Sequence, residues 1–180
     1  MIARQFDAGP QSLNTPSDHE GDNAMLDEKL LECIETAIKR EEDAFAFYTD
    51  LAGNIADETA RDTVLWIAGE EKNHKLFLEK FRDKGQGPSS MRKAEVTYYK
   101  LAEHLDEPEA SDSLSRAEVF LLAAHREKRA HEFYTDLAAL YDEGGQVREM
   151  LLRIANEELK HKEKMEYLYA NTSFPQTDGG

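Results

Sequence analysis

The chain has 180 residues, of which 40% are hydrophobic and 33% charged, with 10 glycines and 5 prolines. This length predicts one domain with its own core, and the low glycine and proline content favours helices and excludes a collagen-like or wholly disordered chain. The net charge of −15 argues against nucleic acid and anionic membranes as partners, because both are negatively charged.

A single cysteine, Cys33, excludes an internal disulfide and a zinc or iron–sulfur site built from several cysteines. The sequence contains no run of about 18 apolar residues, and its first 24 residues lack the apolar stretch of a signal peptide. We therefore expect a soluble, cytoplasmic protein.

Four long segments have the periodicity of amphipathic helices, and the breaks between them contain glycine, proline or short polar residues. The predicted helices are residues 25–55, 57–84, 113–143 and 146–170, with a weaker fifth helix at 90–105. We expect residues 1–23 and 172–180 to be flexible tails, because they are polar and aperiodic. The domain between them spans residues 24–171.

Two helix boundaries are indicated by residue type. Ser111, Asp112 and Ser113 are candidate N-caps for the third long helix, since short polar side chains accept from the first free backbone N–H groups. Gly144 and Gly145 separate the last two helices.

The chain contains an internal repeat. Residues 47–52, FYTDLA, recur letter for letter at 133–138, and seven of the thirteen residues in 67–79 match those in 154–166. A repeat that occurs only twice is no solenoid and indicates a duplicated helix hairpin. The sequence therefore predicts an all-α four-helix bundle of two hairpins joined by a long crossover that contains a short helix.

A glutamate interrupts the apolar stripe of each long helix near its middle, and on two helices a histidine follows three residues later, on the same face. The residues are Glu41, Glu71, His74, Glu127, Glu158 and His161. Four converging carboxylates repel one another, and a pair of divalent cations would neutralise them. Lone glutamates from two helices with Glu-x-x-His from two others are the ligand set of di-iron and di-manganese bundles. The ligand types suit iron or manganese better than a lone zinc.

Other polar residues lie near this set. Glu70 and Glu157 are alternative ligands, but each lies about 100° off its stripe, so we expect them at the surface or as hydrogen-bond partners. Tyr48 and Tyr134 lie two turns from the lone glutamates and are either core aromatics or hydrogen-bond partners of the ligands. His131, one turn after a lone glutamate, either approaches the metals or packs in the core or at its rim.

The sequence resembles the rubrerythrin branch of the ferritin-like superfamily over residues 25–170. The motif Glu-x-x-Ala-x-x-x-Tyr begins at Glu41 and Glu127, and Glu-Glu-x-x-His begins at Glu70 and Glu157. The resemblance implies a ferritin-like bundle in which the six residues above bind two iron ions, with manganese or zinc as substitutes. It also implies reaction with peroxide or dioxygen and suggests a homodimer. Both bridging and chelating roles stay open for the second glutamate of each Glu-Glu-x-x-His motif.

Two departures from the family bear on function. Typical rubrerythrins carry a rubredoxin domain with paired Cys-x-x-Cys motifs, which this sequence lacks, so we expect a separate electron donor. They also have an additional glutamate where this chain has Ala130, which matches Ala44 and favours a more symmetric six-ligand site. Two functions fit: a di-iron oxidoreductase that oxidises Fe(II) or reduces peroxide, and a non-catalytic iron or manganese module for metal buffering or partner binding.

Overall fold

The computed structural model describes residues 19–84, 99–111 and 113–174, and the side chains of the first helix from residue 28 onward. Four helices account for most of them: α1 (His19–Asn54), α2 (Glu58–Lys84), α3 (Arg116–Ala138) and α4 (Gln146–Ser173). These described parts contain no strand, which confirms the predicted all-α fold.

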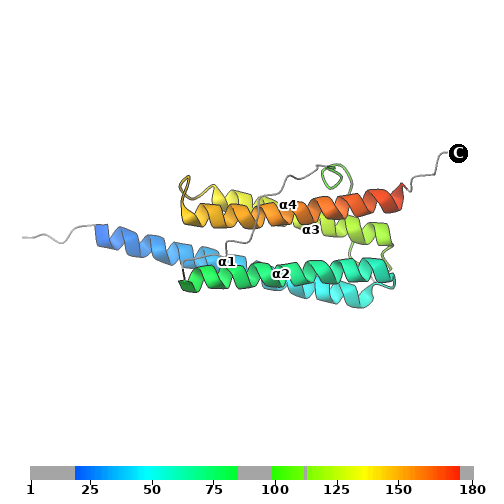
Figure 1. Ribbon diagram of the computed structural model, residues 1–180, viewed down its shortest axis with the longest axis horizontal. Coiled ribbons are helices and arrows are strands. Elements are labelled where there is room, and N and C mark those ends of the chain that lie inside the picture. The colour runs from blue at the N-terminus through cyan, green and yellow to red at the C-terminus, as the bar shows by residue number, and fades with distance from the viewer. Residues whose placement is uncertain (1–18, 85–98, 112, 175–180) are drawn as a thin grey trace, which may run out of the picture.

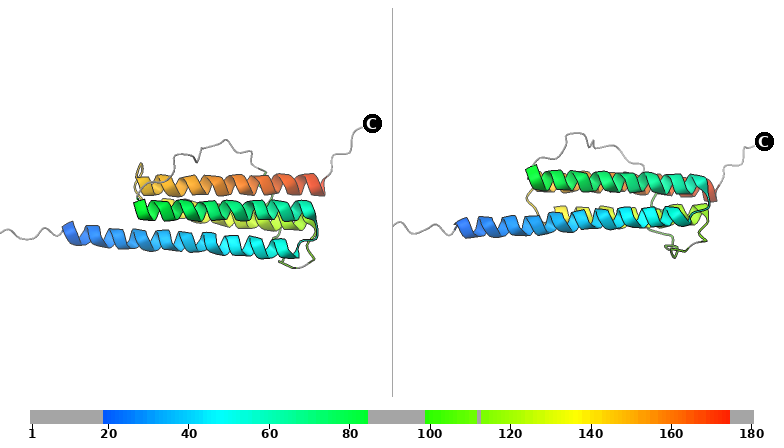
Figure 2. Two further views of the ribbon diagram at one scale, coloured as in Figure 1. Left: turned by 60° about the horizontal axis from the view of Figure 1, so that its bottom comes forward. Right: turned by 90° about the horizontal axis from the view of Figure 1, so that it is seen from below.

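The helices form two antiparallel hairpins, α1 with α2 and α3 with α4, which lie against each other along their lengths (Figures 1 and 2). The last residue of α2 and the first residue of α3 lie at opposite ends of the bundle (Figure 1). This is the predicted ferritin-like arrangement, with one long crossover between two hairpins. The first turns of α1 extend beyond the other helices (Figure 2).

The boundaries of α3 differ from the prediction at both ends. Its N-cap is Ser115, which accepts from the N–H of Glu118, while the Glu118 carboxylate accepts from the N–H of Ser115. This reciprocal capping box satisfies two helix-end donors, so the earlier candidates were wrong. The helix ends at Ala138, not at residue 143. After it, the N–H groups of Leu140 and Tyr141 donate to carbonyls three residues earlier, and Arg148 of α4 donates to the carbonyl of Ala138. Gly144, with a φ of 76°, makes the predicted break before α4.

The predicted fifth helix is wrong for its described part, residues 99–105. Residues 90–98 lie outside the described residues. The N–H of Tyr99 donates to Glu163 of α4 at 2.8 Å, and that of Ala102 donates to Glu166 at 2.7 Å. Lys100 has a φ of 57°, which a helix does not allow. Carboxylates of α4 thus take two backbone donors of this segment, while the N–H groups of His104 and Leu105 donate to the carbonyl of Leu101 in a single turn.

A buried lysine completes the attachment of the crossover. Lys162 is 2% exposed, and its ammonium group lies 3.2 Å from Glu103, 3.2 Å from Glu163 and 3.1 Å from Glu166. A buried charge is tolerated only when it is paired and hydrogen-bonded, as here. This network binds the segment before α3 to the outer face of α4.

The core consists of two apolar clusters, one toward each end of the bundle. Residues 48–68 and 119–124 supply most of the first, and residues 34–38, 77–81 and 134–155 most of the second. The interrupting glutamates lie between these clusters, so the middle of the bundle is both buried and polar.

The predicted tails lie mostly outside the described residues. Residues 19–23, assigned to the first tail, belong to α1, and residues 172–173, assigned to the second, belong to α4, while the domain boundaries stay predictions. Among the described residues, no helix is both long enough and apolar enough to span a membrane.

We expect Glu166→Ala to lower the free energy of unfolding by about 2–4 kcal/mol, because it removes the acceptor of the Ala102 N–H and one partner of buried Lys162. Urea denaturation with a chelator present measures it. The matched control Glu132→Ala removes an exposed carboxylate 4.0 Å from Lys128 and should change stability by less than about 0.5 kcal/mol. Equal effects of the two substitutions would show that the network does not hold the crossover.

Candidate metal centre

All six candidate ligands predicted from the sequence meet in the middle of the bundle. The helices contribute Glu41 from α1, Glu71 and His74 from α2, Glu127 from α3, and Glu158 and His161 from α4. None is more than 3% exposed. They are buried because each residue replaces an apolar one on the inward-facing stripe of its helix.

The six residues form two overlapping groups with the arrangement of a metal site. One contains Glu41, Glu71, His74 and Glu158, and the other contains Glu71, Glu127, Glu158 and His161. In each group the four candidate ligand atoms lie within 4.8 Å of one another. Glu71 and Glu158 belong to both groups.

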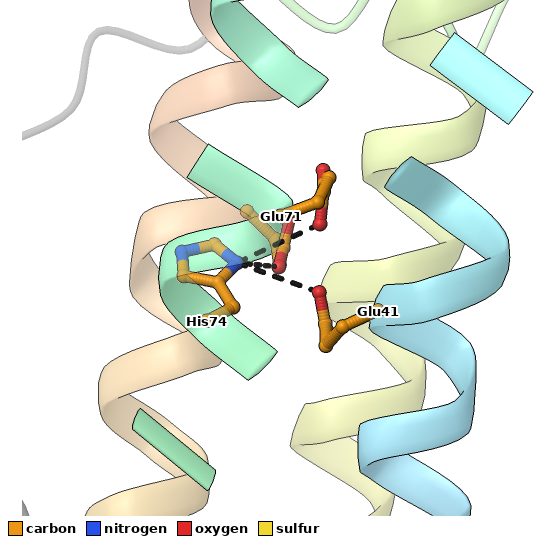
Figure 3. Close-up of side chains that lie close together, drawn as sticks. Glu41, Glu71 and His74 are labelled. Atoms are coloured by element: carbon orange, nitrogen blue, oxygen red, sulfur yellow. Dashed lines mark ion pairs between the residues drawn. The ribbon is translucent and has the colours of Figure 1, made fainter. Parts of the chain in front are cut away.

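His74 faces three of the carboxylates (Figure 3). Its Nδ1 atom lies 2.8 Å from Oε1 of Glu158 and 3.7 Å from an oxygen of both Glu41 and Glu71. Three oxygens from three helices therefore surround one imidazole nitrogen.

His161 has the equivalent position in the second group. Its Nδ1 lies 3.5 Å from Oε2 of Glu127 and 3.6 Å from Oε2 of Glu158. The rings of His161 and His74 stack at 5.5 Å with an interplanar angle of 16°. The two hairpins thus contribute matching halves of one centre.

Several of these atoms are buried without a hydrogen bond of acceptable geometry. They are Glu41 Oε2, His74 Nδ1, Glu127 Oε2, both carboxylate oxygens of Glu158, and His161 Nδ1. Buried polar atoms nearly always have a partner, because an unpaired one costs about 1–3 kcal/mol. Carboxylate oxygens and imidazole nitrogens are common ligands of iron and manganese. The donor set therefore fits divalent cations, which would satisfy these atoms.

Each lone glutamate is hydrogen-bonded by a tyrosine of the other hairpin. Tyr48 of α1 donates to Glu127 of α3, and Tyr134 of α3 donates to Glu41 of α1. Burial and the charge of that glutamate raise the pKa of each phenol well above its usual value, so both remain donors. Of the two readings open for these tyrosines, the structure therefore supports hydrogen-bond partners.

Burial and mutual charge shift the protonation of the cluster. Burial and the charges of Glu158 and Glu127 hold the pKa of Glu71 well above the usual range. Burial also raises the pKa of Glu127 to about 7. Burial disfavours the imidazolium of His161, but contact with Glu127 and Glu158 outweighs this and raises the pKa to about 9. Without metal the cluster therefore holds protons at neutral pH.

The other candidates lie apart from the two groups. Glu70 contacts Asn73 at 3.3 Å, and Glu157 pairs with Lys160 at 2.7 Å, so neither faces the centre. Nδ1 of His131 lies 2.7 Å from the carbonyl oxygen of Ala155, which ties its ring to the backbone of α4. This contact supports the prediction that His131 lies at the rim of the core, and not the alternative that it approaches the metals.

A cavity of about 290 Å³ reaches the centre from the side of α1 and α3. Glu41, Glu71 and Glu127 form its inner wall, and Ala44 and Ala130 also line it. Ala130, at the position where typical rubrerythrins have an additional glutamate, thus lies beside this cavity.

Two contacts of the site were not predicted from the sequence. The ring of Trp66 packs edge-on against His161 with centroids 5.2 Å apart, and Arg40 and Arg126 line the cavity. The internal repeat could have indicated both arginines, because Arg40 and Arg126 occupy equivalent positions in it. Trp66 has no counterpart in the repeat.

Comparisons with known proteins agree with this geometry. Residues 32–118 match the sequence model of the rubrerythrin family. The match and the fold are consistent with a rubrerythrin-like, ferritin-like domain. A hypothetical protein from Pyrococcus furiosus is similar in structure, with a TM-score of 0.56 and 25% identity over 82% of this chain and 92% of that one. A search of curated proteins found no match.

The matched segment of the rubrerythrin-like domain contains Glu41, Glu71 and His74, the ligand candidates of the first hairpin. Their counterparts in the second hairpin lie beyond it and follow from the internal repeat. The family match and the buried carboxylate and imidazole cluster together indicate a metal-binding site of the di-iron carboxylate kind.

We expect metal affinity to increase with pH. The metal-bound form holds fewer protons than the apo form, in which Glu127 has a pKa of about 7 and His161 of about 9. Affinity for Mn(II) should therefore rise between about pH 6 and pH 8, by about tenfold per pH unit for the His161 proton and, below about pH 7, by a further factor for the Glu127 proton.

Trp66 provides the readout, because it is the only tryptophan and touches His161. Mn(II) should quench its fluorescence, and a metal-free titration over the same pH range corrects for protonation of the histidine. An affinity that is independent of pH, or metal that binds without quenching, would contradict this assignment.

Proposed function

We propose that this chain binds two iron ions through the six residues and uses them to react with peroxide or dioxygen, oxidising Fe(II) or reducing peroxide. The observation that carries the proposal is the overlap of the two groups, which share Glu71 and Glu158. Two carboxylates common to two four-ligand groups are what a pair of neighbouring cations requires. Four carboxylates would balance the charge of two divalent ions.

The bound iron pair would supply the redox chemistry, and the chain's own residues prepare the site for it. Tyr48 and Tyr134 hold the lone glutamates in place from opposite helices and keep a proton on each phenol oxygen. The apolar clusters on both sides close the ligand shell toward the two ends of the bundle. These features support one defined geometry for the ions.

The cavity gives small molecules a route to the candidate metal ligands. Its inner wall includes three of the glutamates, so a small oxidant entering between α1 and α3 would arrive at the ligands. A metal-buffering site also needs a path by which ions enter and leave, so reaction with an oxidant is what distinguishes the two functions. We infer that the oxidant enters here and that a separate molecule supplies or accepts electrons.

Loading with Fe(II) under anaerobic conditions tests the ligand assignment. At a metal concentration about 100 times the dissociation constant, binding stabilises the fold by about 2.7 kcal/mol, which should raise the melting temperature by roughly 5–10 °C. We expect Glu71→Ala to lose most of this shift. The matched control Glu70→Ala removes the neighbouring, outward-facing carboxylate and should keep it.

Addition of peroxide or dioxygen to the loaded protein then tests the chemistry. We expect about two iron ions per chain, oxidation of the bound Fe(II), and consumption of the oxidant that Glu71→Ala abolishes and Glu70→Ala retains. Bound iron that neither oxidant converts would support metal buffering instead. Equal behaviour of the two variants would overturn the ligand set.

A further inference from the structure

We propose that the cavity beside the candidate metal centre binds a small oxyanion, a phosphate- or carboxylate-type group, through the guanidinium groups of Arg40 and Arg126. The inference rests on the proposed function, because it names a class of ligand for the cavity through which the metals would be reached.

Both arginines are held in place by aromatic rings of the opposite hairpin. The guanidinium carbon of Arg40 lies 4.0 Å from the centre of the Phe133 ring, and that of Arg126 lies 3.6 Å from the centre of the Phe47 ring. Both arginines line the cavity. A guanidinium held above an aromatic ring keeps N–H groups that can bind an oxyanion, at little further cost in side-chain entropy.

Within the described parts of the chain, neither guanidinium group forms an ion pair or a hydrogen bond, although the charge of Arg126 acts on Glu107, which is bound by Arg129. The Nε atom of Arg126 is buried and lacks an acceptor. A buried N–H donor of this kind nearly always has an acceptor, and a bound oxyanion would supply one. Arg129, which also lines the cavity, differs because both ends of its fork bind Glu107, at 2.5 and 2.9 Å.

Space and charge at the cavity also favour an oxyanion. Its volume of about 290 Å³ exceeds what a water or peroxide molecule needs, and Ala44 and Ala130 leave it open. Asp43 lines it too, but it pairs with Lys39 at 2.9 Å. Once two divalent ions balance the four buried carboxylates, Arg40 and Arg126 supply an excess of positive charge on a protein of net charge −15. The oxyanion should therefore bind the metal-loaded protein and not the apo protein.

Phosphorus NMR of inorganic phosphate tests the site and its position together. The protein is loaded with Mn(II), freed of unbound metal by gel filtration, and analysed for retained metal before phosphate is added. Phosphate in the cavity lies close to the paramagnetic ions, so its signal should broaden in proportion to occupancy, whereas phosphate bound on the distant surface should not.

We expect Arg126→Gln to weaken phosphate binding by about tenfold or more, with retained metal unchanged, because it removes charge-assisted hydrogen bonds. Arg40→Gln, at an exposed side chain, should weaken it as well and provides a variant with little risk to folding. The control Arg61→Gln removes the same charge from α2. Arg61 lies about ten residues from Glu71, which is about 15 Å along the helix axis, so this variant should leave phosphate binding unchanged.

The outcomes separate this inference from the proposed function. Failure to retain metal would overturn both. Retained metal without broadening, or Arg126→Gln and Arg40→Gln variants that melt at lower temperature yet bind phosphate as before, would overturn the inference alone and leave the arginines a structural role.

A second arm distinguishes the source of the oxyanion. Consumption of a carboxylate-bearing hydroperoxide is compared with that of uncharged tert-butyl hydroperoxide. A KM that Arg126→Gln raises only for the charged peroxide would place the oxyanion on the substrate. Unchanged KM values together with weakened phosphate binding would identify a free anion. A variant that changes neither phosphate binding nor KM would contradict the proposal.

Discussion

The structure depends on four glutamate carboxylates that the fold removes from water at one level of the bundle. Their burial is expensive, because each loses hydration and each repels the others. Apolar clusters above and below keep the carboxylates from turning toward the ends of the bundle. The cost of their burial therefore has to be offset by groups within the site. Two histidines and two tyrosines supply part of this compensation. Cations bound to the atoms that lack partners would supply the rest.

The duplication explains why this compensation works equally on both sides. Each hairpin supplies a tyrosine to the lone glutamate of the other, and each supplies a phenylalanine ring to an arginine of the other. Neither hairpin therefore completes its own half of the centre, and assembly of the two is a condition for the site. The symmetry is broken at Trp66, which touches one histidine only, and at the crossover, which attaches to α4.

The sequence was sufficient for the six-residue cluster because helical periodicity and the repeat constrain the same positions twice. Glu158, for example, follows both from the apolar stripe of α4 and from its match to Glu71. Features that depend on distant contacts could not be read in this way. Residues 99–105 show helical spacing, yet Glu163 and Glu166 accept from two of their backbone N–H groups. Ser115 caps α3 in place of equally suitable serines nearby, because Glu118 completes its capping box.

Anomalous diffraction from crystals loaded with Fe(II) tests the central claim most directly, because it locates the metal without reference to activity. The account predicts two iron peaks, one among Glu41, Glu71, His74 and Glu158 and the other among Glu71, Glu127, Glu158 and His161. Glu71 and Glu158 should then contact both ions. A single peak, or iron bound at Glu70 and Glu157 with the buried cluster empty, would contradict it.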